Sequence, residues 1–169
     1  MATRRKDVED SVTWFKNLIK GRNNPNATYH AVPQIGSMYM YRYDPKWKEV
    51  LPFWDKQPLT IPIDYYSDGF LGLNLHYLPP SGRSKLLSAL SKYTTGENEK
   101  KTMQVSYSIL QTAIRHRLFM PCVKRYLTAH VRSRFEYIQP DEWSKAVSLP
   151  TQRFQGARAM TVWRRSARR

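Results

Sequence analysis

Two apolar runs joined by an Asp-Gly turn constrain the fold of this chain more than any other feature. Residues 59–65 and 70–77 flank the sequence Tyr66-Ser67-Asp68-Gly69. Asp-Gly between two such runs is typical of a β-hairpin, because glycine tolerates the positive φ that a tight turn demands. We therefore expect two antiparallel strands that meet at residues 66–69.

The second arm of this hairpin alternates along its length, which assigns its side chains to two faces. Pro62 lacks the N–H that a central strand needs, so we predict that the first arm is an edge strand or a short one. Phe70 and Asn74 are expected on one face of the second arm. The opposite face is expected to carry the buried set Leu71, Leu73, Leu75 and Tyr77.

The remaining segments mix helical and strand-like patterns. Pro121 should interrupt a long helical stretch, because proline has no N–H to donate and clashes with the preceding turn. The patterns predict a helix over 6–20, a polar linker over 22–34, a strand over 38–43, a packed irregular segment over 51–56, a helix over 81–93, a polar loop over 94–101, helices over 102–119 and 121–133, a strand over 135–138 and a helix start at 140–143.

These elements predict an α+β fold, in which a small antiparallel sheet or partly open barrel packs against C-terminal helices. An N-terminal helix and a basic C-terminal arm complete it. We divide the chain into an N-terminal helix and linker arm over 1–34, an α+β core domain over 35–157 and an arginine-rich tail over 158–169. The tail has little apolar periodicity, so we expect it to order only on a partner and its removal to leave the core folded.

The charge of the chain is high and unevenly distributed. It has 28 Lys and Arg against 13 Asp and Glu, a net charge of +15. Residues 1–99 carry only +3 of this, and residues 100–169 carry +12. Such a surplus predicts an anionic partner, and each neutralised phosphate of a nucleic acid would add affinity by releasing a counterion.

Other classes of protein are excluded by composition. A hydrophobic fraction of 41% is too high for a disordered chain. Cys122 is alone, so no internal disulfide scaffold is expected. No apolar run is long enough to span a membrane, and the N-terminus lacks the apolar segment of a secretory signal. We therefore expect a soluble, intracellular, strongly basic protein without a membrane partner.

The candidate binding residues come from the basic C-terminal part. Between residues 102 and 135 there is no acid, and arginine forks suit phosphate oxygens. Arg125, Thr128 and Arg132 would share one face of the expected helix. Nucleic acid and an acidic protein surface remain equally good partners at this point. The candidate set is Arg115, Arg117, Lys124, Arg125, Arg132, Arg134, Arg153, Arg158, Arg164, Arg165, Arg168 and Arg169.

Catalytic chemistry has no comparable signal. The four histidines are far apart in sequence and Cys122 stands alone, so no metal site and no cofactor are expected. Neither a nucleophile elbow nor a glycine-rich phosphate loop is present. A metal-dependent nuclease stays open as an alternative, and it would need clustered carboxylates. Its candidate carboxylates are Asp44, Glu49, Asp55, Asp64 and Asp68.

Six segments of the chain resemble a family of small phage proteins. They read GSMYMYRYDPK (36–46), LPFWD (51–55), DGFLGLNLHYLP (68–79), PCVKRYL (121–127), HVRSRF (130–135) and LPTQRF (149–154). The pattern is similar to that of the DNA end protector proteins of T-even-like phages and marine cyanophages. The resemblance covers about residues 10–160 and brings no catalytic residues with it.

The resemblance implies a non-enzymatic virion structural protein that binds or caps DNA ends near the head–tail connector. Its partners would be DNA ends or the phosphate backbone and other virion proteins of the neck or tail. It would be found in the virion, and in the host cytoplasm during assembly. The alternative is a tail or baseplate structural protein whose arginines dock on acidic neighbour subunits.

Overall fold

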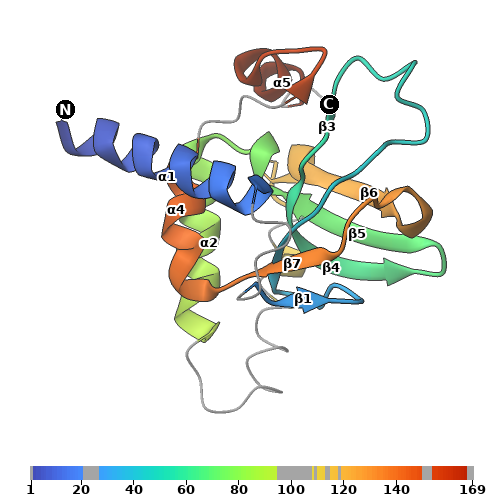
Figure 1. Cartoon of the computed structure of the whole chain (residues 1–169), viewed down its shortest axis with the longest axis horizontal. Coiled ribbons are helices and arrows are strands. Elements are labelled where there is room, and N and C mark those ends of the chain that lie inside the picture. Colours follow the sequence, from blue (N-terminus) through green and yellow to red (C-terminus); the bar gives the residue numbers. More distant parts are fainter. Residues whose placement is uncertain are drawn as a thin grey trace.

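The computed structural model describes residues 2–20, 27–94, 108, 110–112, 115–117, 119–149 and 154–166. It is an α+β protein, as predicted (Figure 1). Its helices are α1 (Ala2–Lys20), α2 (Pro80–Thr94), α4 (Trp143–Ser148) and α5 (Ala159–Ser166). Its strands are β1 (Tyr29–His30), β2 (Met38–Met40), β3 (Trp54–Asp55), β4 (Leu59–Tyr66), β5 (Gly69–Asn74), β6 (Val123–Leu127), β7 (Phe135–Ile138) and β8 (Phe154–Gln155). Short 3₁₀ turns are η1 (Leu75–Tyr77), η2 (Met120–Cys122), η3 (Thr128–His130) and η4 (Pro140–Glu142).

Six strands form one antiparallel sheet in the order β1-β7-β2-β4-β5-β6, and β3 pairs with β8 in a second small sheet. The large sheet is open, with β1 and β6 as its edges. Outside the large sheet, the segment that follows β2 meets the segment that follows β6, and Tyr43 forms an isolated antiparallel β-bridge with Val131. The sheet is therefore the small antiparallel sheet expected from the sequence, and it does not close into a barrel.

The Asp-Gly hairpin is present, with β4 and β5 paired from Thr60 opposite Asn74 to Tyr66 opposite Gly69. Leu73 is fully buried on one face and Phe70 is 2% exposed on the other, so the predicted two-faced alternation is confirmed. The alternation ends at Asn74, where β5 ends. The side-chain oxygen of Asn74 accepts a hydrogen bond from the N–H of His76 and thereby caps η1. Leu71 is only half-buried.

Gly69 is required for a different reason from the one predicted. Its φ is not positive, since only Gly36 and Gly156 have positive φ among the described residues. A Cβ at Gly69 would instead lie 1.9 Å from the carbonyl oxygen of Tyr126. The backbone of β6 approaches β5 so closely at this point that only glycine fits.

Pro62 does not place its strand at an edge, so that prediction is wrong. β4 has eight residues and lies between β2 and β5. The register of the β4–β5 pair shifts between Pro62 and Asp64, and such a bulge accommodates a residue without an N–H. The carbonyl of Pro62 still accepts a hydrogen bond, from the N–H of Gly36.

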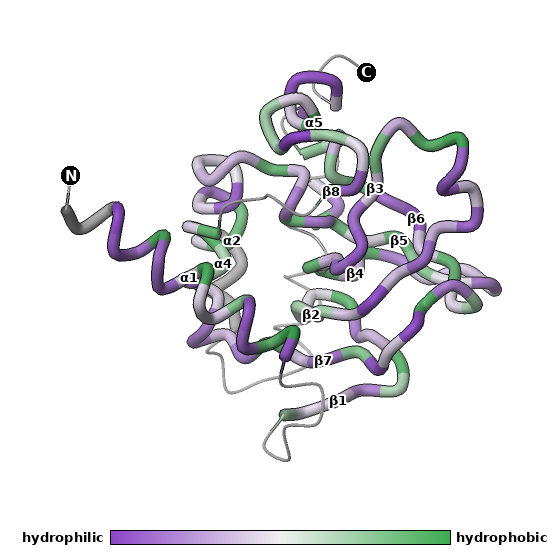
Figure 2. Tube along the Cα trace, turned by 45° about the horizontal axis from the view of Figure 1, so that its top comes forward, coloured by the Kyte–Doolittle hydropathy of each residue, from purple (hydrophilic) through white to green (hydrophobic). Residues whose placement is uncertain are grey.

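Both faces of the sheet are covered. One face packs against α1, α2 and α4, which lie together on one side of the sheet (Figure 1). Figure 2 shows hydrophilic and hydrophobic stretches alternating along α1, as expected of a helix with one face in the core. The other face carries six tightly packed rings, the aromatic cluster: Tyr39, Tyr41, Tyr43, Phe70, Tyr126 and Phe135.

The helix expected over 121–133 is wrong. Residues 123–127 form the edge strand β6, and η2 and η3 flank it. Tyr126 stacks on Phe70 of β5 at 5.4 Å, and this ring contact together with strand pairing outweighs the weak helical preference of the run. Of the helix expected over 102–119, residues 108 and 110–112 are helical and 115–117 form a turn; most of the rest, like the loop over 95–101, lies outside the described residues.

The tail is not without structure where it is described. Residues 159–166 form α5, and Val162 is fully buried in the main core. The indole N–H of Trp163 donates to the carbonyl of His76 at 3.0 Å. The expectation that the tail orders only on a partner is therefore wrong for residues 159–166, because the buried Val162 and the Trp163 hydrogen bond anchor this helix to the core.

Arg83 of α2 is an unexpected core residue, with no exposed surface. Its guanidinium donates to the carbonyls of Leu75, Leu78, Ala146 and Leu149. Burial lowers the pKa of Arg83 to about 10, so the side chain is still charged at neutral pH. The arginine thereby joins α2 to η1 and to the end of α4.

Candidate nucleic-acid interface

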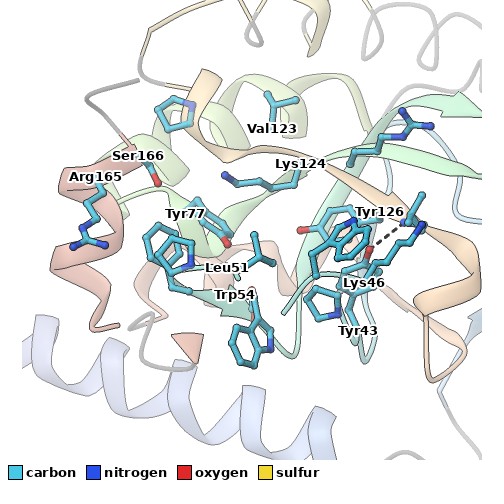
Figure 3. Close-up of a pocket in the computed structure, with 18 of the residues that line it drawn as sticks. Tyr43, Lys46, Leu51, Trp54, Tyr77, Val123, Lys124, Tyr126, Arg165 and Ser166 are labelled. Carbon is cyan, nitrogen blue, oxygen red and sulfur yellow. Dashed lines mark hydrogen bonds between the residues drawn. The ribbon is translucent and has the colours of Figure 1, made fainter. Parts of the chain in front are cut away.

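A groove of about 830 Å³ lies where three distant parts of the chain meet. One wall is the loop between β2 and β3, the second is β6 with the η2 turn before it, and the third is the end of α5. Figure 3 shows Lys46 and Arg165 at opposite sides of this groove, with Lys124 between them. We call it the aromatic–basic groove: Tyr43, Pro45, Lys46, Trp47, Leu51, Pro52, Phe53, Trp54, Asp55, Asp68, Tyr77, Met120, Pro121, Val123, Lys124, Arg125, Tyr126, Leu127, Arg165 and Ser166.

The loop wall is ordered by its own hydrogen bonds. Lys48 Nζ lies 2.9 Å from Asp44 Oδ1. The N–H groups of Val50 and Leu51 both donate to the carbonyl of Trp47 at 3.1 Å. This turn leaves the Trp47 side chain 63% exposed at the mouth of the groove.

Three of the eight exposed large hydrophobic residues in the described part of the chain line this groove. Trp47, Leu51 and Met120 all line the groove, and each is at least 40% exposed. Leaving large apolar side chains in water costs free energy of about 25 cal/mol for each Å². A clustered exposed patch of this kind marks an interaction surface.

Two cations of the groove lie over tyrosine rings. Lys124 Nζ lies 4.2 Å from the centre of the Tyr77 ring, and Arg125 Cζ lies 4.5 Å from that of Tyr66. Arg125 also donates to Asp68 Oδ1 at 2.7 Å, and this hydrogen bond holds the pKa of the exposed Asp68 carboxyl below its ordinary value. The rings thus hold the cations at the surface of the groove.

A buried polar network supports the floor of the groove. Asp55 of β3 accepts hydrogen bonds from the Gln57 N–H, the Asn74 side-chain amide and the His76 imidazole. Asn74 also donates to the Tyr126 hydroxyl at 3.0 Å. Burial holds the pKa of Tyr126 well above its ordinary value, so the hydroxyl keeps its proton. The network fixes β3 against β5 and β6.

The structure brings only part of the predicted set together. Lys124, Arg125 and Arg165 line the aromatic–basic groove, and Arg132 lines a second pocket beside it. Arg134 lies elsewhere, with its guanidinium 3.9 Å from the centre of the Tyr29 ring. Arg125 and Arg132 share no helix face, because residues 123–127 are a strand. Four predicted cations are exposed outside the groove, namely Arg115, Arg117, Arg158 and Arg164, and three lie outside the described residues, namely Arg153, Arg168 and Arg169.

Sequence reasoning missed the loop side of the site. Lys46 and Trp47 line the groove, and Arg42, Lys48 and Lys56 line the pocket beside it. All five lie in the half of the chain whose net charge is only +3. The missed signal was local: basic residues interleave with a tryptophan directly after the Asp44-Pro45 turn.

A metal-dependent nuclease would need clustered carboxylates, and three of the five candidate carboxylates are instead paired with cationic or imidazole side chains. Within the described residues, no three His, Cys, Asp or Glu side chains gather as a metal site would require. Asp55 pairs with His76, Asp44 with Lys48 and Asp68 with Arg125. Cys122 is buried, and burial raises the pKa of its thiol to about 12.

The chain matches one family model, described as the phage T4 terminal DNA protecting protein, over residues 2–166. This match confirms the resemblance drawn from the six sequence segments. No curated protein and no solved structure matches the chain. In the part of the chain that the structure describes, none of the helices has the length and apolar character needed to cross a bilayer.

Proposed function

The chain belongs to the family of the phage T4 terminal DNA protecting protein, and on this basis we propose that it protects DNA ends by binding them, without catalysis, in the aromatic–basic groove. One observation carries the proposal. Three exposed apolar residues, Trp47, Leu51 and Met120, line the same cavity as four cations, Lys46, Lys124, Arg125 and Arg165. A ligand with flat apolar faces and phosphates matches that lining.

Stacking on the groove would distinguish a DNA end from the interior of a duplex. The terminal base pair exposes one of its flat faces, whereas every other pair is covered on both sides. The exposed indole of Trp47 can cover that face. Stacking of a base on an aromatic side chain is worth about 1–3 kcal/mol and does not depend strongly on the base. Such a contact suits a protein that binds ends of any sequence.

The cations of the groove would hold the backbone beside the stacked end. Lys46 and Arg165 have no carboxylate partner among the described residues, whereas Asp68 partly neutralises Arg125. Contacts to phosphate position DNA and carry no sequence information. Arginines outside the groove, such as Arg115 and Arg164, would extend these contacts or dock on neighbouring proteins.

We place this activity in the virion, at the DNA terminus near the head–tail connector. The surplus of exposed arginine beyond the groove supports further partners among the neck or tail proteins. The protein would pass through the host cytoplasm during assembly. A chain that caps an end would exclude exonucleases by occupying the site where they start.

The test compares linear blunt DNA with the same DNA in a closed circle. The wild-type protein is expected to bind the linear form more tightly and to protect it from an exonuclease. Trp47→Ala should reduce the ratio of the affinities for linear and circular DNA roughly tenfold, because it removes a stacking contact of about 1–3 kcal/mol. Val32→Ala is the matched control, because Val32 is 64% exposed and lies outside the groove.

Equal binding of the two DNA forms would overturn end recognition. If neither form binds while the protein still enters particles, the arginines dock on acidic neighbour subunits. That outcome would establish the alternative of a tail or baseplate structural protein.

A further inference from the structure

A second pocket of about 440 Å³ adjoins the groove and differs from it in character. It contains four cations and a single carboxylate. Its lining residues are Arg42, Tyr43, Asp44, Lys48, Trp54, Lys56, Arg132 and Gln155. We call it the basic pocket.

The only carboxylate of the basic pocket is already used. Asp44 is paired with Lys48 at 2.9 Å. The hydrogen bond and charge of Lys48, together with the charges of Arg132 and His130, hold the pKa of Asp44 below its ordinary value. Within the described part of the chain, Arg42, Lys56 and Arg132 have no carboxylate partner.

The backbone holds these cations together. The N–H of Arg132 donates to the carbonyl of Arg42 at 2.8 Å, and the N–H of Tyr43 donates to the carbonyl of Lys56 at 3.1 Å. The N–H of Arg42 donates to the Ser133 hydroxyl. Hydrogen bonds of the main chain thereby join the three segments, so the backbone positions that carry these like charges stay close together. An anion with several oxygens would relieve their repulsion.

The basic pocket also shares a wall with the aromatic–basic groove. Tyr43 and Trp54 line both cavities. A DNA end stacked in the groove would therefore have its outermost phosphate within reach of the pocket. A terminal phosphate carries a charge of about −1.5 to −2 at neutral pH, as phosphomonoesters do, and a backbone phosphate carries about −1.

We infer that the basic pocket binds the terminal phosphate group of the DNA end that the groove holds. This inference rests on the proposed function. It makes the end-binding surface selective for phosphorylated termini, since the three cations without a carboxylate partner interact more strongly with a dianion than with a monoanion. The pocket adds charge recognition to the shape recognition of the stacking surface.

The experiment measures the affinity of the full chain for one blunt duplex with either 5′-phosphate or 5′-hydroxyl ends. Wild-type protein is expected to bind the phosphorylated duplex roughly tenfold more tightly, the range for charge-assisted hydrogen bonds. The double variant Lys56→Ala/Arg132→Ala should lose this difference and keep its affinity for the 5′-hydroxyl duplex. Lys16→Ala/Lys20→Ala removes the same charge from exposed positions on α1 and should keep the difference.

The outcomes separate this inference from the proposed function. If neither duplex binds, the proposed function itself fails. If both bind equally to wild type, ends are bound but the terminal phosphate is not recognised. If the double variant weakens both duplexes by the same factor, the pocket holds a backbone phosphate, which overturns the assignment to the terminus. Unchanged thermal unfolding of the variants would show that their folds are intact.

Discussion

The imidazole Nδ1 of His76 lies 2.5 Å from the carboxylate Oδ2 of Asp55, and each side chain is only 3% exposed. This contact joins β3, which ends the groove loop, to the turn that follows β5. The carbonyl of His76 also accepts the indole N–H of Trp163. One residue therefore connects two walls of the groove, and stability and binding should respond together when it is disturbed.

Removing the Asp55 carboxylate should destabilise the protein strongly. Asp55→Ala leaves three buried donors without their acceptor, and breaking a buried pair in this way costs about 3–5 kcal/mol. Chemical denaturation measures the loss. Asp10→Ala removes an exposed carboxylate from α1 and should change the free energy of unfolding by less than about 0.5 kcal/mol. Similar losses in both variants would contradict the role of the network.

Two glycines of β5 form a matched pair. A Cβ at Gly69 would collide with the Tyr126 carbonyl at 1.9 Å, whereas a Cβ at Gly72 would meet its nearest atoms at 3.4 and 3.5 Å, which is ordinary contact. Gly69→Ala should therefore lower the free energy of unfolding by about 1–3 kcal/mol or more. Gly72→Ala should cost clearly less. Thermal unfolding of the two variants side by side decides the point.

The C-terminal helix should contribute to stability. Trp163→Phe keeps a ring but removes the donor to His76, at a cost of about 0.5–1.5 kcal/mol. Deleting residues 158–169 also removes the buried Val162 and should lower the melting temperature further. Met160→Ala, at a position 63% exposed on the same helix, is the control. A truncated chain that melts like the full one would show that α5 does not stabilise the core.

Salt dependence should count the phosphate contacts of the groove. Each contact contributes a slope of roughly −0.9 to a plot of log affinity against log salt. Lys124→Ala/Arg165→Ala should therefore make the slope shallower by about 2, with the same change for different DNA sequences. The α1 variant Lys16→Ala/Lys20→Ala should leave the slope as it is. A slope that is the same in all three proteins would remove these two cations from the interface.

Cys122 should be inert in the folded protein. Burial raises the pKa of its thiol from 9.0 to about 12, so the reactive thiolate is scarce at neutral pH. Iodoacetamide should label it only after unfolding. Between pH 9 and 12 the unfolded thiol loses its proton and the folded one keeps it, so this group makes stability fall as pH rises. Cys122→Ala should show a smaller alkaline loss than wild type; rapid labelling of the native protein would contradict the burial.

What could be predicted from sequence was local. The hairpin around Asp68-Gly69, the helix ending at Lys20 and the strand at 135–138 each have a pattern within a few neighbouring residues. β6 could not be recognised, because the run from Val123 to Leu127 has two cations and no turn signal, and its strand state depends on pairing with β5. The position of Pro62 in a central strand depends on a bulge, which could not be predicted from the pattern of neighbouring residues.

The same distinction holds for the candidate site. Charge density pointed to Lys124, Arg125 and Arg165, and these three do line the groove. The distribution of charge could not identify Lys46 or Trp47, because the net charge of a segment does not show which side chains lie close together in the fold. The pairing of β2 with β4 and of β5 with β6 brings the loop after β2 close to β6. Binding by any of these residues stays a prediction until it is measured.

The three walls of the groove come from segments that are synthesised at different times. The loop between β2 and β3 is made first, β6 follows after some seventy further residues, and α5 is made last of the three. Segments emerge from the ribosome in sequence order, and a domain folds as a unit. A nascent chain can therefore present Trp47 early, but its groove has no third wall until α5 has emerged and packed. If the groove binds DNA ends as proposed, that binding becomes possible only after α5 has been synthesised and has packed as its third wall.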